Sequence, residues 1–96
     1  MEQAVKNSKQ CDFFTYLLRC ADGSFYCGWT VDLEHRLTVH NQGKGARYTR
    51  VRLPVELVYY EKFASRGEAM KRENQIKNMD REKKIRLIAR KAKHGI

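Results

Sequence analysis

The sequence predicts a small α+β domain in which a three-stranded antiparallel sheet is flanked by helices. The chain has 96 residues, 42% hydrophobic and 32% charged, which is typical of one globular domain. Two aromatic and apolar runs separated by a turn predict a β-hairpin near its start. Later segments have helical periodicity and begin with capping residues. The expected order is ββαβαα, in which no two successive strands have to be parallel.

The chain divides into three predicted parts. We expect residues 1–12 to be a flexible leader, residues 13–91 to form one domain, and residues 92–96 to be a basic C-terminal tail. The first ten residues are polar and lack a signal-peptide pattern, and no apolar run is long enough to span a membrane. The three cysteines show no CxxC spacing, which predicts free thiols in a reducing cytoplasm and argues against a cysteine-based zinc site.

The first hairpin is predicted over residues 13–29. "DFFTYLLRC" and "FYCGW" have strand composition, and "ADGS" between them is a turn. A two-residue turn would place Tyr16 and Tyr26 on opposite faces of the hairpin. A three-residue loop with Gly23 in the left-handed conformation would place both on one face. The residues alone leave both alternatives open, but a site that uses both tyrosines requires the three-residue loop.

The later elements are predicted from periodicity, caps and breakers. Residues 32–41 have helical period and end at Asn41-Gln42-Gly43. Residues 43–52, with two glycines and four basic residues, are expected to be a loop. A strand starts at Pro54, where a strand tolerates proline. Two helices follow, at 65–78 with Ser65 as N-cap in an S-x-x-E capping box, and from Asp80 to about Lys91.

The charge of the chain predicts a polyanionic partner. Twenty Lys and Arg residues face eleven Asp and Glu residues, for a net charge of +9, and nucleic acid is the commonest partner of so basic a domain. The loop at 44–52 and the basic segment from Lys77 to His94 are the expected phosphate contacts. Solubilising surface charge is one alternative. An acidic membrane is another, which the lack of an amphipathic segment with a bulky apolar face makes the weakest.

Two helix faces carry polar residues beside apolar ones. Glu73 falls among the apolar residues of the 65–78 helix, where a carboxylate needs a cation, strong donors or a metal. Taken alone, a structural Glu–Arg pair is the favoured explanation. Arg36 and His40, one helical turn apart, border the Leu33 and Leu37 stripe of the first helix. They are suited to hold a phosphate, or else Arg36 snorkels and His40 packs.

These residues together form an ordered set with a known resemblance. Tyr16 in "TYL", the "YCG" at 26–28, Arg36, His40 and Glu73 resemble the motifs of the GIY-YIG nuclease domain. The chain looks like the small stand-alone bacterial members called UPF0213, over about residues 13–90. The first motif here lacks its Gly-Ile, and Trp29 follows the second motif where many members have a lysine.

The resemblance implies a metal-dependent endonuclease that hydrolyses phosphodiester bonds of DNA, with structure-directed or weak sequence specificity. It implies a divalent ion, Mg²⁺ or Mn²⁺, on Glu73, a phosphate clamp at Arg36, and a general base at Tyr16. Tyr26 would position the water or the phosphate, and His40 would assist proton transfer or hold phosphate. Arg36 and the metal are expected to lower the Tyr16 pKa. The substrate strand is expected to contact Lys44, Arg47, Tyr48 and Arg50.

Two other functions fit the same features. One is a non-catalytic module that binds DNA or RNA, which Trp29 in place of lysine favours. The other is a structural partner in a larger repair or RNA complex. A protein partner that supplies specificity is also compatible with a chain that carries no attached recognition domain.

Overall fold

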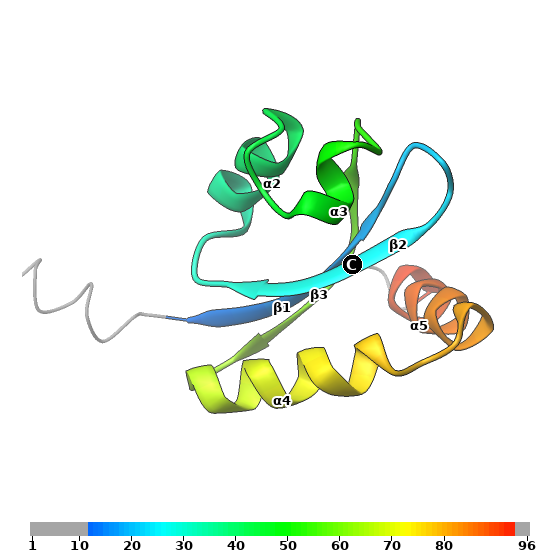
Figure 1. Cartoon of the computed structure of the whole chain (residues 1–96). Coiled ribbons are helices and arrows are strands. Elements are labelled where there is room, and N and C mark those ends of the chain that lie inside the picture. The colour runs from blue at the N-terminus through cyan, green and yellow to red at the C-terminus, as the bar shows by residue number, and fades with distance from the viewer. Residues whose placement is uncertain (1–11, 94–96) are drawn as a thin grey trace, which may run out of the picture.

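A three-stranded antiparallel sheet forms the centre of the molecule, as predicted (Figure 1). The computed structural model describes the backbone of residues 12–93 and the side chains of residues 12–90. The strands are β1 (Phe13–Arg19), β2 (Phe25–Thr30) and β3 (Glu56–Phe63), in the spatial order β2-β1-β3. The first strand is therefore central, and both neighbours pair with it.

The β1–β2 loop has the three-residue form that a shared tyrosine site requires. Tyr16 is opposite Gly28 and Leu18 is opposite Tyr26, so that Tyr16 and Tyr26 lie on the same face of the sheet. Gly23 has a φ of +86°, a left-handed conformation that glycine adopts without steric cost. This prediction is confirmed.

Within residues 12–93, four helices cover the two faces of the sheet: α2 (Leu33–Asn41), α3 (Arg47–Arg50), α4 (Arg66–Lys77) and α5 (Arg81–Lys93). The predicted caps are confirmed, because Ser65 Oγ accepts from the Glu68 amide and Asp80 Oδ1 accepts from the Lys83 amide. Each side chain satisfies an amide that has no partner within its helix. Helix α5 ends two residues beyond its predicted end at Lys91.

Two predicted boundaries are wrong. The 43–52 segment is not a continuous loop, because it contains the short helix α3. Strand β3 begins at Glu56 rather than at Pro54. The amide of Val55 donates to Asn41 Oδ1 at 2.8 Å, and the Asn41 amide donates to the Val55 carbonyl at 3.0 Å. The Asn41 side chain thus satisfies the Val55 backbone amide and carbonyl, which would otherwise bond to a neighbouring strand.

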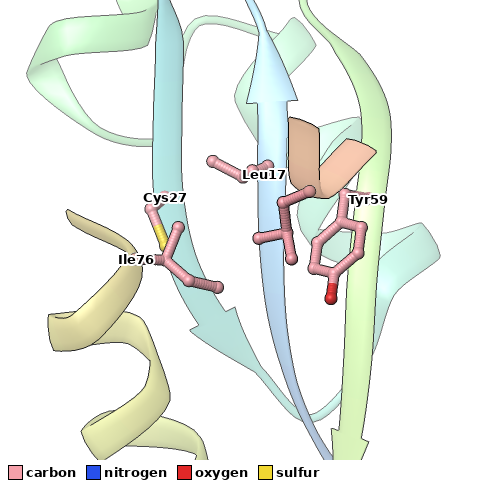
Figure 2. Close-up of a cluster of buried hydrophobic side chains, with 5 residues drawn as sticks. Leu17, Cys27, Tyr59 and Ile76 are labelled. Carbon is pink, nitrogen blue, oxygen red and sulfur yellow. The ribbon is translucent and has the colours of Figure 1, made fainter. Parts of the chain in front are cut away.

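The sheet buries two separate clusters, one on each face. On the face covered by α4 and α5, Leu17 of β1 packs with one residue from each neighbouring element (Figure 2). That cluster, the Leu17 face, consists of Leu17, Cys27, Tyr59, Ile76 and Leu87. On the opposite face, beneath α2 and α3, the buried residues are Tyr16, Leu18, Cys20 and Val55. We call this the Tyr16 face (Figure 1).

The predicted leader at 1–12 falls almost wholly outside the described residues, as do residues 94–96 of the predicted tail. Those boundaries stay predictions. No helix within the described part of the chain is long and apolar enough to cross a membrane.

Candidate active site

Four rings gather on the Tyr16 face. The Tyr16 and Tyr26 ring centroids are 6.5 Å apart, and the His40 ring lies 6.0 Å from Tyr16 and 5.3 Å from Tyr26. Tyr48 of α3 stacks on Tyr26 at 6.3 Å. The hairpin supplies both predicted tyrosines, α2 supplies the histidine, and α3 covers them. The structure thus brings together four residues that the sequence analysis named.

A directed chain of hydrogen bonds links Tyr16 to α3. The Tyr16 hydroxyl is 3.0 Å from His40 Nε2, and His40 Nδ1 is 2.9 Å from Thr49 Oγ1. The Thr49 hydroxyl donates its single proton to the Ala46 carbonyl at 3.0 Å. It must therefore accept from His40 Nδ1–H. His40 Nε2 then carries the lone pair and accepts the proton of the Tyr16 hydroxyl.

Burial keeps both His40 and Tyr16 uncharged at neutral pH in the protein without substrate. Burial, with the nearby charge of Arg36, lowers the His40 pKa from 6.5 to about 4, so that the imidazole is neutral at pH 7. Burial also raises the Tyr16 pKa to about 12, even though Arg36 acts to lower it. Arg36 acts on the Tyr16 pKa in the predicted direction, but loss of solvent outweighs the guanidinium alone; the combined effect of Arg36 and a metal stays a prediction.

His40 does not border the core as expected. Its side chain is fully buried, and both ring nitrogens are engaged by Tyr16 and Thr49. Direct contact of His40 with a phosphate would require one of these two bonds to break, and the burial agrees with the alternative that His40 packs. A proton exchange between His40 and Tyr16 remains compatible with it.

Two glycines make room for this chain. A Cβ at Gly28 would lie 2.5 Å from the Tyr16 hydroxyl, and a Cβ at Gly45 would collide with the His40 ring. Gly28 is the last residue of the "YCG" motif, and its absence of a side chain is what lets Tyr16 lie across β2. Gly45 does the same for His40 from the segment before α3.

Arg36 lies beside the tyrosines at the edge of the cluster. It shares a small apolar recess with Tyr16 and Leu33, and its charge acts on the pKa values of Tyr16, Tyr26 and His40. Burial raises the Tyr26 pKa, whereas the charges of Lys77 and Arg36 lower it. The half-buried Arg36 is thus the cation that all three titratable groups share.

Glu73 reaches the same region from α4, along the edge of β2. Its carbonyl accepts from Cys27 Sγ at 3.7 Å, and its charge and that of Lys77 both act on Tyr26. The predicted Glu–Arg pair is wrong, because Glu73 Oε2 pairs with Lys77 Nζ at 3.6 Å. The Glu73 side chain is 19% exposed and that of Lys77 is 53% exposed.

The basic residues of the 44–50 segment are exposed on α3 and just before it. Lys44, Arg47 and Arg50 all face solvent. Tyr48 is only partly available, because the Arg52 guanidinium lies 3.8 Å above its ring centroid. Arg52 is in turn held by Asp22 Oδ2 at 3.0 Å. A nucleic-acid base could therefore stack on that face of Tyr48 only after Arg52 moved away.

Trp29 lies away from these residues. It pairs with Thr15 across the β1–β2 ladder, and Thr15 Oγ1 donates to the Ala69 carbonyl of α4. Trp29 therefore belongs to the α4 side of the sheet, near Phe13 and the Arg66 guanidinium.

Not all of the site was predicted from the sequence: Thr49, Gly45 and the pairing of Lys77 with Glu73 were missed. Thr49 and Gly45 act through tertiary contacts, and no local pattern marks them. Lys77 follows Glu73 by four residues, and this spacing does predict a helical ion pair.

Comparison with known proteins agrees with this arrangement. Residues 12–86 match the family model described as the GIY-YIG catalytic domain. A UPF0213 protein of Staphylococcus saprophyticus is 49% identical over 76 residues, which cover 79% of this chain and 93% of that protein. A UPF0213 protein of Staphylococcus aureus is 51% identical over 75 residues, 78% of this chain and 92% of that protein.

Two solved structures resemble the fold. The NMR structure of a UPF0213 protein from Bacillus halodurans is 44% identical, has a TM-score of 0.53, and covers 81% of this chain and 83% of that one. An NMR structure of a protein from E. faecalis is 45% identical, has a TM-score of 0.54, and covers 79% of this chain and 81% of that one.

Proposed function

The chain belongs to the GIY-YIG catalytic domain family, and on that premise we propose that it is a metal-dependent endonuclease acting on DNA. The reaction is hydrolysis of a phosphodiester bond, in which a water molecule attacks phosphorus. Such a reaction needs a base for the water, neutralisation of charge on the phosphoryl group, and stabilisation of the leaving oxygen.

The observation that carries the proposal is the directed bond from Tyr16 to His40 Nε2. A phenol with a pKa of about 12 holds its proton at neutral pH and is a poor base by itself. A neutral imidazole that already accepts from the hydroxyl is placed to take that proton. With a His40 pKa of about 4 the transfer is uphill in the free chain, so it would require the bound phosphate and metal to lower the Tyr16 pKa. We assign Tyr16 as the general base, with His40 receiving its proton and Thr49 holding the imidazole in the tautomer that can do so.

The other groups then take distinct roles. Arg36 contacts the scissile phosphate, because its guanidinium can bind two phosphate oxygens at once. Tyr26 positions the attacking water or the phosphate beside Tyr16. Lys77, whose charge already acts on Tyr26, supplies the cation that many family members carry at the position of Trp29.

The family generally uses a divalent metal, and Glu73 has the chemistry to bind one. Mg²⁺ is bound by one or two carboxylates, with water and substrate phosphate completing its shell. Residues 12–93 contain no cluster of three or more His, Cys, Asp or Glu side chains, so that a single carboxylate, Glu73, is the donor beside the tyrosines. Lys77 is exposed enough to leave it. When bound there, Mg²⁺ or Mn²⁺ would neutralise phosphate charge and stabilise the leaving oxygen.

The substrate strand beyond the cleavage point is proposed to contact the exposed residues on and just before α3: Lys44, Arg47, Tyr48 and Arg50. Their charges lie on exposed positions next to the ring cluster, and they offer phosphate contacts without base recognition. Structure-directed or weakly specific cleavage follows from contacts of this kind. A partner protein could add specificity, in DNA repair for example.

Cleavage of labelled DNA substrates with Mg²⁺ or Mn²⁺ tests the proposal. The panel contains duplex, single-stranded, flap and four-way junction DNA. Wild type should cut at least one of them, and Tyr16→Phe, Arg36→Ala and Glu73→Gln should each lower the rate by about 100-fold or more, since each removes a group acting on the reacting atoms.

Binding and thermal stability of the same variants provide the control. Val31→Ala, at an exposed site, should cut like wild type. Cleavage that persists in Tyr16→Phe would rule out Tyr16 as the base.

A second candidate function is a non-catalytic nucleic-acid-binding module. The observation that favours it is burial, because Tyr16 is only 2% exposed and His40 is fully buried. In that case the pair stabilises the fold. Wild type would bind nucleic acid without cutting any substrate in either metal, and Tyr16→Phe would lower stability without affecting binding.

A further inference from the structure

An open groove lies between α4 and α5, on the Leu17 face of the sheet. Its volume is about 350 Å³, and its lining residues are Arg72, Met79, Lys83, Arg86, Leu87 and Arg90. Four of these six side chains are cations, and the other two are apolar. We call this the α4–α5 groove.

The groove is separate from the candidate active site. Arg72 is tied to β3, because its Nε and Nη2 donate to the Glu61 carboxylate at 2.9 and 3.0 Å. Tyr26 belongs to β2, the opposite edge strand. The sheet also lies between α4 and α5, which line the groove, and the helices α2 and α3 on its other side (Figure 1). With strands spaced by ~4.8 Å, the two edge strands are ~10 Å apart. The groove and the ring cluster lie on different faces, while Glu73 reaches Tyr26 from the β2 side of α4.

The charge of the groove is only partly balanced. Glu61 neutralises Arg72, and Glu82 approaches Arg86 at 3.8 Å on the surface of α5, where both side chains are largely exposed. Within residues 12–90, Lys83 has no carboxylate within ion-pairing distance. Lys83 therefore contributes positive charge that no carboxylate of the described residues offsets by an ion pair, and the groove there is complementary to an anion.

The spacing of the cations fits a linear anion better than a single ion. Lys83, Arg86 and Arg90 are three and four residues apart, so that they lie along one side of α5. At a rise of ~1.5 Å per residue they extend over ~10 Å of the helix axis. A row of cations of this length can contact successive phosphates of one strand. Met79 adds an apolar surface for the sugars between those phosphates, and the buried Leu87 forms the floor of the groove.

We propose that the α4–α5 groove binds the phosphate backbone of a second segment of the nucleic acid whose first segment occupies the Tyr16 face. The inference rests on the proposed function and names its substrate class. A straight duplex lying against one face of so small a sheet cannot also contact the opposite face. Branched or sharply folded nucleic acid presents two arms and can contact both.

The experiment compares binding of a four-way junction with binding of one of its arms as a plain duplex, over a range of salt concentrations. The test variant is Lys83→Gln/Arg86→Gln, at two exposed positions that leave the Arg72–Glu61 pair intact. The matched control is Lys62→Gln/Lys71→Gln, which removes the same charge from exposed positions outside the groove. Metal is omitted so that no substrate is cut, and thermal melting verifies the fold.

Wild type should bind the junction with a steeper salt dependence than the arm. The groove variant should lose this difference, because each phosphate contact contributes ~0.9 to the slope of log K against log salt, or ~1.8 for two. The control variant should keep it.

Three outcomes would overturn the inference: an unchanged groove variant, equal losses in groove and control variants, or a wild type that does not distinguish junction from arm. If the groove variant lost binding to polyglutamate but kept the junction preference, the occupant would be an acidic protein segment instead. Failure of the nuclease proposal is measured separately, as a lack of DNA cleavage in the presence of metal. The binding measurement uses neither metal nor cleavage.

Discussion

The two faces of the sheet bury different chemistry. On the Leu17 face, the buried residues of α4 and α5 up to residue 90 are Ala69, Ile76 and Leu87, of which Ile76 and Leu87 pack with Leu17. On the Tyr16 face, the buried residues of α2 and α3 are His40 and Thr49. The Leu17 face therefore buries mainly apolar surface, with the Thr15 hydroxyl satisfied by one bond to the Ala69 carbonyl. The Tyr16 face has to satisfy a buried imidazole and two hydroxyls together.

The Tyr16 face carries the larger free-energy cost of burying polar groups. A buried polar group destabilises a protein unless it is hydrogen-bonded. Among the described residues, no buried side-chain nitrogen or oxygen lacks a partner, and on the Tyr16 face this takes a chain of bonds from Tyr16 through His40 and Thr49 to Ala46. An arrangement so demanding is easier to explain by chemistry at Tyr16 than by packing alone.

The largest change in stability is expected for a substitution on the Leu17 face. Leu17→Ala should lower the free energy of unfolding by about 2–5 kcal/mol, because Leu17 is fully buried and its truncation leaves a cavity. Urea denaturation measures this, with Val31→Ala at a 54% exposed position as the control, expected within about 0.5 kcal/mol of wild type. A loss below about 1 kcal/mol would mean that the Leu17 face is not the main source of stability.

The Tyr16 face should make the free energy of unfolding depend on pH. The His40 pKa is about 4 in the fold against an ordinary 6.5, so that the unfolded chain binds more protons between these values and stability rises with pH across this window. Acidification from pH 7 toward pH 4 should therefore remove up to about 3 kcal/mol from this group.

Urea denaturation of the wild type at several pH values measures this slope, which His35→Gln should retain and a folded His40→Asn should reduce. An equal slope in His40→Asn would assign the pH dependence to carboxylates instead.

A smaller effect separates two glycines that look alike in the sequence. Gly45→Ala should lower stability by about 1–3 kcal/mol, since the added methyl group collides with the buried His40 ring. Gly67→Ala should raise it by about 0.4–1 kcal/mol, because its Cβ meets nothing within 4 Å and alanine favours the helix. Thermal denaturation of both variants gives the comparison. A neutral Gly45→Ala would show that the His40 ring can shift at little cost.

Much of the fold was predictable because its signals are local. The hairpin and the caps at Ser65 and Asp80 depend on residues within a few positions of one another. Helix α3 was missed, since glycines and charges give no periodic pattern over four residues. The start of β3 was placed two residues early, because the Val55 bonds with Asn41 join residues that are distant in sequence.

By itself, the sequence determined the sheet with its helices, the capping residues and the set of motif side chains, all of which follow from short-range periodicity and turn chemistry. Only the tertiary structure decided that His40 faces inward onto Tyr16, 24 residues away, and that the basic C-terminal helix lies across the sheet from Tyr16 and Tyr26. Burial and partner choice depend on which distant segments pack together, and a spacing within one segment contains no record of that packing.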